Sequence, residues 1–119
     1  MKRKDVKNKV IFTTQVVPPL DSSLPVVADA RKALNENLNV ISLESYMVGK
    51  LFATIMQAID GPLTRENFLK AARRQPYDLG GVKVDFTTDN QGSDFVGLNV
   101  LKDDRFVPTT ANELAALIK

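Results

Sequence analysis

The amino-acid sequence predicts one domain of the α/β class, with its elements in the order β-α-α-α-β-β-β-α. Residues 42–59 repeat apolar side chains with the period of a helix, and two shorter segments, 24–34 and 65–74, carry helix-capping signals. Beyond Pro76 the apolar period changes to that of strands. The 119 residues, 44% hydrophobic and 25% charged, suit a single hydrophobic core.

Residues 42–59 are expected to form one long, mostly buried helix around which the chain is organised. Its apolar stripe is wide enough to pack between a sheet and other elements. One row of the stripe contains Leu43, Met47, Leu51, Ile55 and Ile59, and the adjacent row contains Val48, Phe52 and Met56. Ser42 is the expected N-cap and Glu44 is placed in the first turn, while Gly61 followed by Pro62 is the expected C-terminal stop.

The segments before this helix predict a strand and a helix. Residues 10–17 are rich in β-branched residues and precede Pro18 and Pro19, so a strand is expected to end there. Its apolar density is typical of a strand buried on both faces, as parallel strands covered by helices are. A helix is expected over 24–34, with Pro25 in its first turn, where no N–H group is needed.

A shorter helix is expected after the central one. Thr64 can cap a helix over 65–74, and Gln75-Pro76 stops it. Its inward-facing side chains are expected to be Phe68, Leu69, Ala71 and Ala72.

The last third of the chain predicts mainly strands, over 82–86, 95–101 and 106–107. The last two are expected to form a hairpin that Pro108 terminates. Thr110 and Glu113 have capping-box spacing, which predicts a short terminal helix.

The chain contains no cysteine and no histidine. This removes disulfides, thiol chemistry, imidazole bases and the usual zinc ligands, and no pair of a nucleophile and a base is evident. Asp85, Asp89 and Asp94 lack the spacing of an EF-hand and are expected to be solvated turn residues. We therefore expect a protein that is not an enzyme and has no metal or cofactor.

Most of the basic charge lies at the N-terminus. Residues 1–9 hold five basic residues and one acidic residue, which leaves 11 basic and 13 acidic residues in the remainder. A nucleic-acid-binding protein would carry a basic stripe on its ordered surface, so this distribution argues against that class. Residues 1–9 are expected to be a disordered basic tail, and neither a signal-peptide core nor a membrane span follows them.

Five motifs occur in a fixed order between residues 10 and 108. They are Val16-Val17-Pro18-Pro19, Ser42-Leu43-Glu44-Ser45-Tyr46-Met47-Val48-Gly49, Thr64-Arg65-Glu66-Asn67-Phe68-Leu69, Asp78-Leu79-Gly80-Gly81-Val82, and Gln91-Gly92-Ser93-Asp94-Phe95-Val96 with Arg105-Phe106-Val107-Pro108. Their combined order and spacing resemble the C-terminal portion of a type I periplasmic solute-binding protein, of the branched-chain amino-acid (Leu/Ile/Val-binding) class that serves ABC transporters. Ser45 and Asp104 depart from the pattern, since glycine is usual at both positions.

The resemblance implies part of a two-lobed fold with Rossmann-like lobes, which closes on its ligand by hinge motion. It implies that residues 10–37 and 85–119 resemble the C-terminal lobe and that 38–84 resemble the N-terminal lobe. The chain would then cross the hinge at two places, which are marked by Leu38 and Ile41 and by Gly80 and Gly81.

Four residues near these crossings are candidates for ligand binding: Glu44, Tyr46, Tyr77 and Asp78. Structural interpretations stand beside these. Glu44 can complement the helix dipole, Tyr46 can pack with its hydroxyl at the surface, and Asp78 can cap a turn.

We interpret the sequence as a fragment or truncated relative of an ABC-transporter solute-binding protein for amino acids or similar small solutes, with an ABC permease as its partner. A ligand-sensing regulatory or protein-interaction module of the same fold is the alternative. The resemblance implies a periplasmic location, although without a signal peptide the chain as given would stay in the cytoplasm. Because the apolar stripe of the central helix needs cover, self-association is also expected.

Overall fold

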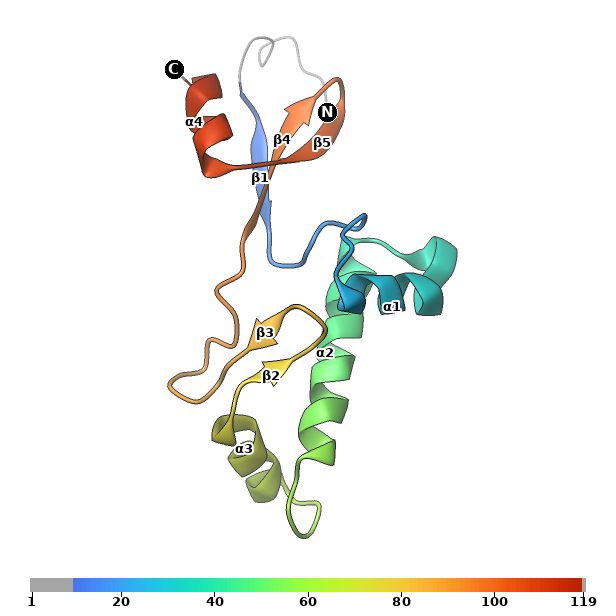
Figure 1. The fold of residues 1–119 in the computed structure, drawn as a ribbon, viewed down its shortest axis with the longest axis vertical. Coiled ribbons are helices and arrows are strands. Elements are labelled where there is room, and N and C mark those ends of the chain that lie inside the picture. The colour runs from blue at the N-terminus through green and yellow to red at the C-terminus, as the bar shows by residue number, and fades with distance from the viewer. Residues whose placement is uncertain (1–9, 119) are drawn as a thin grey trace. The chain divides into compact units, whose positions relative to one another are not determined.

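The computed structural model describes residues 10–118, which form two compact units (Figure 1). The helical unit contains residues 20–94, and the terminal unit contains the described residues before Leu20 and from Phe95 onward. The expected basic tail, residues 1–9, lies outside the described residues.

The terminal unit is built on a three-stranded antiparallel sheet with the order β1-β4-β5. β1 (Phe12–Gln15) pairs with β4 (Gly97–Lys102), and β4 pairs with β5 (Arg105–Thr109). The β4–β5 turn consists of Asp103 and Asp104, whose φ angles of 48° and 67° suit the twist of a two-residue hairpin. The predicted hairpin is therefore confirmed.

Two predictions about these strands are wrong. β1 is antiparallel, it lies at the edge of the sheet, and three of its four residues are exposed. Its β-branched content therefore reflects strand propensity rather than burial. Pro108 does not end β5 but lies within it, opposite Asn99, and this is tolerated because β5 is the other edge strand.

α4 (Ala111–Ile118) starts with the predicted capping box. The Thr110 N–H donates to Glu113 Oε2 at 2.9 Å, and the Glu113 N–H donates to Thr110 Oγ1 at 3.2 Å. The bond from the Thr110 N–H is the largest of the effects that lower the pKa of Glu113. The local sequence signal therefore sets the start of this helix.

α2 (Val40–Gln57) is the long helix of the helical unit, and it begins two residues before the predicted start. Its N-cap is Asn39 rather than Ser42. Asn39 Oδ1 accepts from the Ser42 N–H at 2.9 Å, and Ser42 Oγ accepts from the Asn39 N–H at 2.8 Å, which makes Ser42 the third residue of the helix. Glu44 consequently lies beyond the first turn. The helix also ends before Gly61, whose φ of 89° serves the following loop.

α2 is half exposed rather than mostly buried. Its buried residues are Leu43, Met47 and Ile55. By contrast, Ile41, Val48 and Phe52 are 76%, 62% and 55% exposed. The first predicted row thus enters the core, whereas much of the second is exposed, because no element of the helical unit covers it.

α1 (Pro25–Leu34), the short 3-10 helix η2 (Asn35–Asn37) and α3 (Arg65–Arg74) accompany α2, and both α1 and α3 contact it. Thr64 caps α3 as predicted. A core cluster joins Ala71 and Ala72 of α3 to Ile55 and Tyr77. The predicted burial of Leu69 is wrong, because the core contacts α3 through a neighbouring face and leaves Leu69 exposed.

β2 (Tyr77–Asp78) and β3 (Lys83–Val84) form a short antiparallel hairpin. The single strand expected over 82–86 is shorter than predicted, because the Asp85 N–H bonds to the Gly92 carbonyl and starts a loop. Gly80 and Gly81 supply the hairpin turn, with φ angles of 103° and 91°.

The two units differ from the lobe boundaries expected after residues 37 and 84. Residues 20–37 and 85–94 belong to the helical unit. α1 packs on α2, and its Val26 N–H donates to the Gly80 carbonyl at 3.1 Å. The assignment of segments to the lobes of a larger fold stays a prediction.

Candidate functional site

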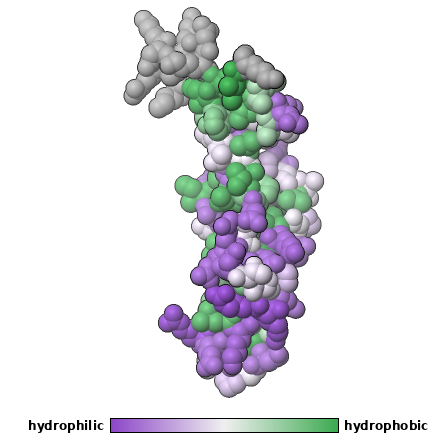
Figure 2. Space-filling view, turned by 90° about the vertical axis from the view of Figure 1, so that its left-hand side faces the viewer, coloured by the Kyte–Doolittle hydropathy of each residue, from purple (hydrophilic) through white to green (hydrophobic). Residues whose placement is uncertain are grey.

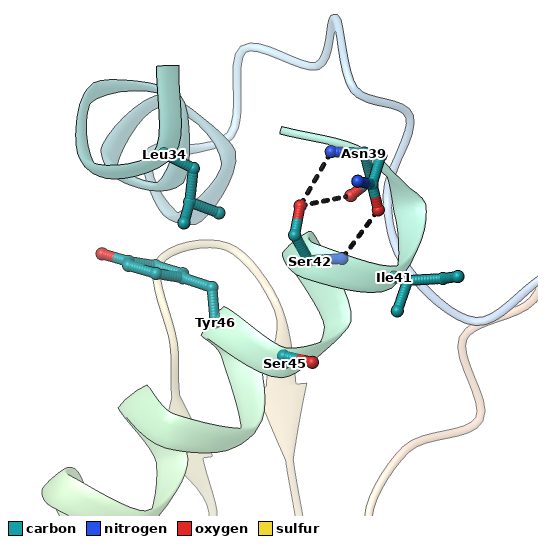
Figure 3. A pocket seen from close by; sticks show the side chains of 6 residues that line it. All are labelled: Leu34, Asn39, Ile41, Ser42, Ser45 and Tyr46. Carbon is teal, nitrogen blue, oxygen red and sulfur yellow. Dashed lines mark hydrogen bonds between the residues drawn. The ribbon is translucent and has the colours of Figure 1, made fainter. Parts of the chain in front are cut away.

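A shallow pocket of about 570 Å³ lies where the chain leaves α1 and enters α2 (Figure 3). Its lining residues are Leu34, Asn39, Ile41, Ser42, Ser45 and Tyr46. Leu34 comes from the last turn of α1, and the ring of Tyr46 is turned toward it. The helix cap therefore shapes the pocket, since it sets where α2 begins.

Part of the polar lining of this pocket is already engaged in the cap. Besides its bonds with Asn39, Ser42 Oγ donates to the Asn37 carbonyl at 2.8 Å. Within residues 10–118, the hydroxyls of Ser45 and Tyr46 have no hydrogen-bond partner, and no charged side chain belongs to the lining. The pocket thus offers apolar contact and two hydroxyls, but no charged group that would form an ion pair with the carboxylate or ammonium of a ligand.

Two sequence-predicted residues meet in this pocket, the ligand-binding candidate Tyr46 and the hinge candidate Ile41. Glu44 is exposed on α2, outside the lining. Leu38, the other hinge candidate of this segment, connects η2 to α2 and is half-buried. The site predicted at the start of the long helix stays a prediction, and the shallow pocket lies beside it.

Tyr77 and Asp78 have structural roles in the helical unit. The Tyr77 ring is 5% exposed, and its hydroxyl donates to the Ala71 carbonyl, which satisfies the buried donor. Asp78 Oδ1 accepts from the N–H groups of Gly80 and Gly81, each at 2.7 Å, and these bonds lower the pKa of Asp78. The predicted turn cap at Asp78 is present.

A second and more apolar groove, of about 340 Å³, lies between α2, α3 and the loop before Asp94. Its lining residues are Val48, Leu51, Phe52, Ile55, Phe68, Leu69, Ala72, Arg73, Phe86 and Asn90. The rings of Phe52 and Phe68 lie with their centroids 5.3 Å apart, and at the rim Arg73 donates to Asn90 Oδ1 at 2.6 Å. Figure 2 shows apolar residues reaching the surface between hydrophilic ones.

The sequence analysis did not predict this groove. Phe86 and Asn90 come to it from a loop, and no local pattern links that loop to α2. The exposed row of α2 was the available signal, because an apolar row beside a buried one calls for a second neighbour.

Within residues 10–118, no group of three or more Asp or Glu side chains is placed to hold a metal ion. No helix in that range combines the length and apolarity that crossing a membrane requires.

No protein-family model and no curated protein matches the chain. A solved structure is similar, the crystal structure of an extracellular ligand-binding receptor from Verminephrobacter eiseniae, with a TM-score of 0.68 and 23% sequence identity. The match covers 81% of this chain and 30% of the receptor chain, so the chain spans less than a third of the receptor's length. This likeness establishes the fold, part of a periplasmic-binding-protein-like α/β architecture, as the sequence predicts.

Proposed function

We propose that the chain is part of an ABC-transporter solute-binding protein that binds an amino acid or a similar small solute and catalyses no reaction. The observation that carries this proposal is the likeness in fold to an extracellular ligand-binding receptor over 81% of the chain. The five sequence motifs add the finer elements of the proposal. These are the branched-chain amino-acid class, an ABC permease as partner and a periplasmic location.

In this proposal the chain supplies one wall of a binding cleft. Burying the two charges of an amino acid without partners is costly, and the pocket at Tyr46 has no charged lining. The pairing groups would come from the larger part of the receptor fold, for which this chain has no counterpart. Tyr46 would contact the solute and Glu44 would approach it on closure, with hinge bending at Leu38 and Ile41 and at Gly80 and Gly81.

The apolar groove beside Phe52 favours a second candidate, a ligand-sensing regulatory or protein-interaction module of the same fold. Exposed apolar grooves of this kind are typical of surfaces that bind other proteins. We also propose that the chain associates with itself, because Ile41, Val48 and Phe52 leave apolar surface in contact with water.

Calorimetry tests the solute-binding proposal in two steps. Leucine, isoleucine and valine titrated into the purified chain should give no binding heat in the micromolar range, and micromolar binding would contradict the incomplete cleft. The same titration into a longer protein, expressed from the coding sequence of this chain and its flanking coding sequence, should give binding. Tyr46→Ala should weaken that binding. A folded product that binds no amino acid would overturn the solute-binding proposal and favour the interaction module.

A further inference from the structure

We propose that the peptide bond between Asp60 and Gly61 is a site of spontaneous isoaspartate formation, and that Arg74 restrains this reaction. Asp60-Gly61 is the only Asp-Gly pair in the sequence, which contains no Asn-Gly pair. The pair lies in the loop that joins α2 to α3 (Figure 1). The inference goes beyond solute binding, because neither residue lines the pocket at Tyr46.

The reaction joins the side chain of an aspartate to the next main-chain nitrogen. The Gly61 nitrogen attacks Asp60 Cγ, a new N–Cγ bond closes a succinimide ring, and the carboxyl OH leaves as water with the amide proton. Water then opens the ring. Attack at the main-chain carbonyl of Asp60 breaks its bond to the nitrogen and leaves the chain linked through Cγ, as isoaspartate. One water is released and one is consumed, and both reacting groups belong to one dipeptide, so no other reactant is required.

The structure leaves both reacting groups accessible. The Asp60 side chain is 90% exposed, and Gly61 is exposed as well. Within residues 10–118, the Gly61 N–H has no hydrogen-bond partner that the attack would have to displace. Gly61 carries no Cβ, and the nearest atom to the place of an added Cβ is Asn67 Nδ2 at 3.8 Å. The side of the glycine on which other residues carry a side chain is therefore open to the approaching carboxyl group.

Arg74 holds the carboxylate of Asp60 in an ion pair. Its Nη1 donates to Asp60 Oδ2 at 2.7 Å, and its Nη2 donates to the Ala58 carbonyl at 2.6 Å, so one guanidinium clamps the loop at two points. The attack requires a neutral carboxyl group, whereas Arg74 pairs with the carboxylate anion. The ion pair must therefore open before the ring can close.

The Arg74 clamp slows the reaction without preventing it. The Arg74 side chain is 46% exposed, and ion pairs in contact with water are weak. Removal of the guanidinium should therefore raise the rate of isoaspartate formation by roughly two- to fivefold.

Isomerisation would also remove the clamp. Isoaspartate adds a carbon atom to the main chain and moves the free carboxylate away from the end of the side chain. Arg74 belongs to the last turn of α3 and Ala58 is the C-cap of α2, so the link between the ends of these helices is weakened. The isomerised chain, separated by chromatography, should unfold at a lower urea concentration than the parent chain.

Peptide mapping by mass spectrometry tests the site. The folded chain, incubated at neutral pH in water labelled with heavy oxygen, should accumulate isoaspartate at position 60 and take up one heavy oxygen atom there. The exposed Asp21, which precedes Ser22, is the internal control and should isomerise less, because the serine side chain hinders the attack. Asp60→Glu should abolish the product at position 60, since its longer side chain closes the ring far more slowly.

Two arginine variants test the clamp. Arg74→Gln should raise the rate as stated, while Arg73→Gln should leave it unchanged, because Arg73 donates to Asn90. In concentrated urea the wild-type chain and Arg74→Gln should react at equal rates, since the clamp exists only in the folded chain.

Each part of the proposal can fail separately. Absence of isoaspartate at position 60 from both the wild-type chain and Arg74→Gln overturns the site. Equal rates in these two folded chains, or an equal rise in Arg73→Gln, overturn the role of Arg74. Circular dichroism verifies that the variants fold, and none of these outcomes depends on solute binding.

Discussion

Replacing Gly80 by alanine should destabilise the helical unit by breaking the link between its hairpin and α1. Gly80 has a φ of 103°, and its carbonyl accepts the Val26 N–H at 3.1 Å. That N–H belongs to the first turn of α1, where the helix itself provides no acceptor. The turn therefore serves both as a bend in the hairpin and as a cap for α1.

The magnitude follows from two effects. A side chain at this φ costs about 1–2 kcal/mol in backbone strain. The new Cβ would lie 2.8 Å from Val26 N and 3.3 Å from Pro25 Cβ, so the turn must move away and the hydrogen bond is lost, at about 1 kcal/mol. Gly80→Ala should therefore lower the free energy of unfolding by about 2–3 kcal/mol.

Urea denaturation followed by far-UV circular dichroism measures this change, and Gly61→Ala is the matched control. Gly61 also has a positive φ, 89°, but the nearest atom to its added Cβ is Asn67 Nδ2 at 3.8 Å, so only the backbone strain of about 1–2 kcal/mol applies. Amide hydrogen exchange should show that Val26 loses protection in the Gly80 variant alone. Equal losses of stability in the two variants, or an unchanged Val26 amide, would refute the reasoning.

Three further predictions concern single hydrogen-bonding groups. Asn39→Ala removes the acceptor of the Ser42 N–H and should lower the free energy of unfolding by about 1 kcal/mol in a urea titration. An unchanged free energy of unfolding would mean that another residue caps the helix. Tyr77→Phe leaves a buried carbonyl of α3 without its donor and should cost about 1–2 kcal/mol, whereas an equally stable variant would mean that water replaces the hydroxyl. Hydrogen bonds from Thr110 lower the pKa of Glu113. The stabilisation that this carboxylate gives α4 is therefore present above its ordinary pKa of 4.5 and is lost as the pH falls through the lower pKa of the folded state. NMR of the α4 amides should show this loss in acid, and the loss should disappear in Glu113→Gln.

Elements fixed by local chemistry were predictable from the sequence. The capping box at Thr110 and the hairpin near Asp103 need only residues a few positions apart, and both are present. The start of α2 shows the limit of such reasoning. Asn39 and Ser42 are both good capping residues, and the helix uses them together as one box, so a rule that chooses one of them misplaces the boundary.

Long-range pairing and burial were not predictable in the same way. β1 pairs with a strand from the opposite end of the described chain, and nothing within residues 10–17 specifies whether that partner runs parallel or antiparallel. Among the candidate site residues, Tyr77 lies in the core because Ile55 and Ala72, from two different helices, surround it. Side-chain type alone does not distinguish a tyrosine in a cleft from one in a core.

The exposed row of α2 depends both on a local sequence pattern and on long-range packing. An apolar row specifies that something must cover it, but not which layer does so. If the larger part of the receptor fold packs on Val48 and Phe52, it competes with a second copy of the chain for the same surface. The two associations are then mutually exclusive, so a segment that completes the fold lowers the self-associated fraction of the chain by mass action.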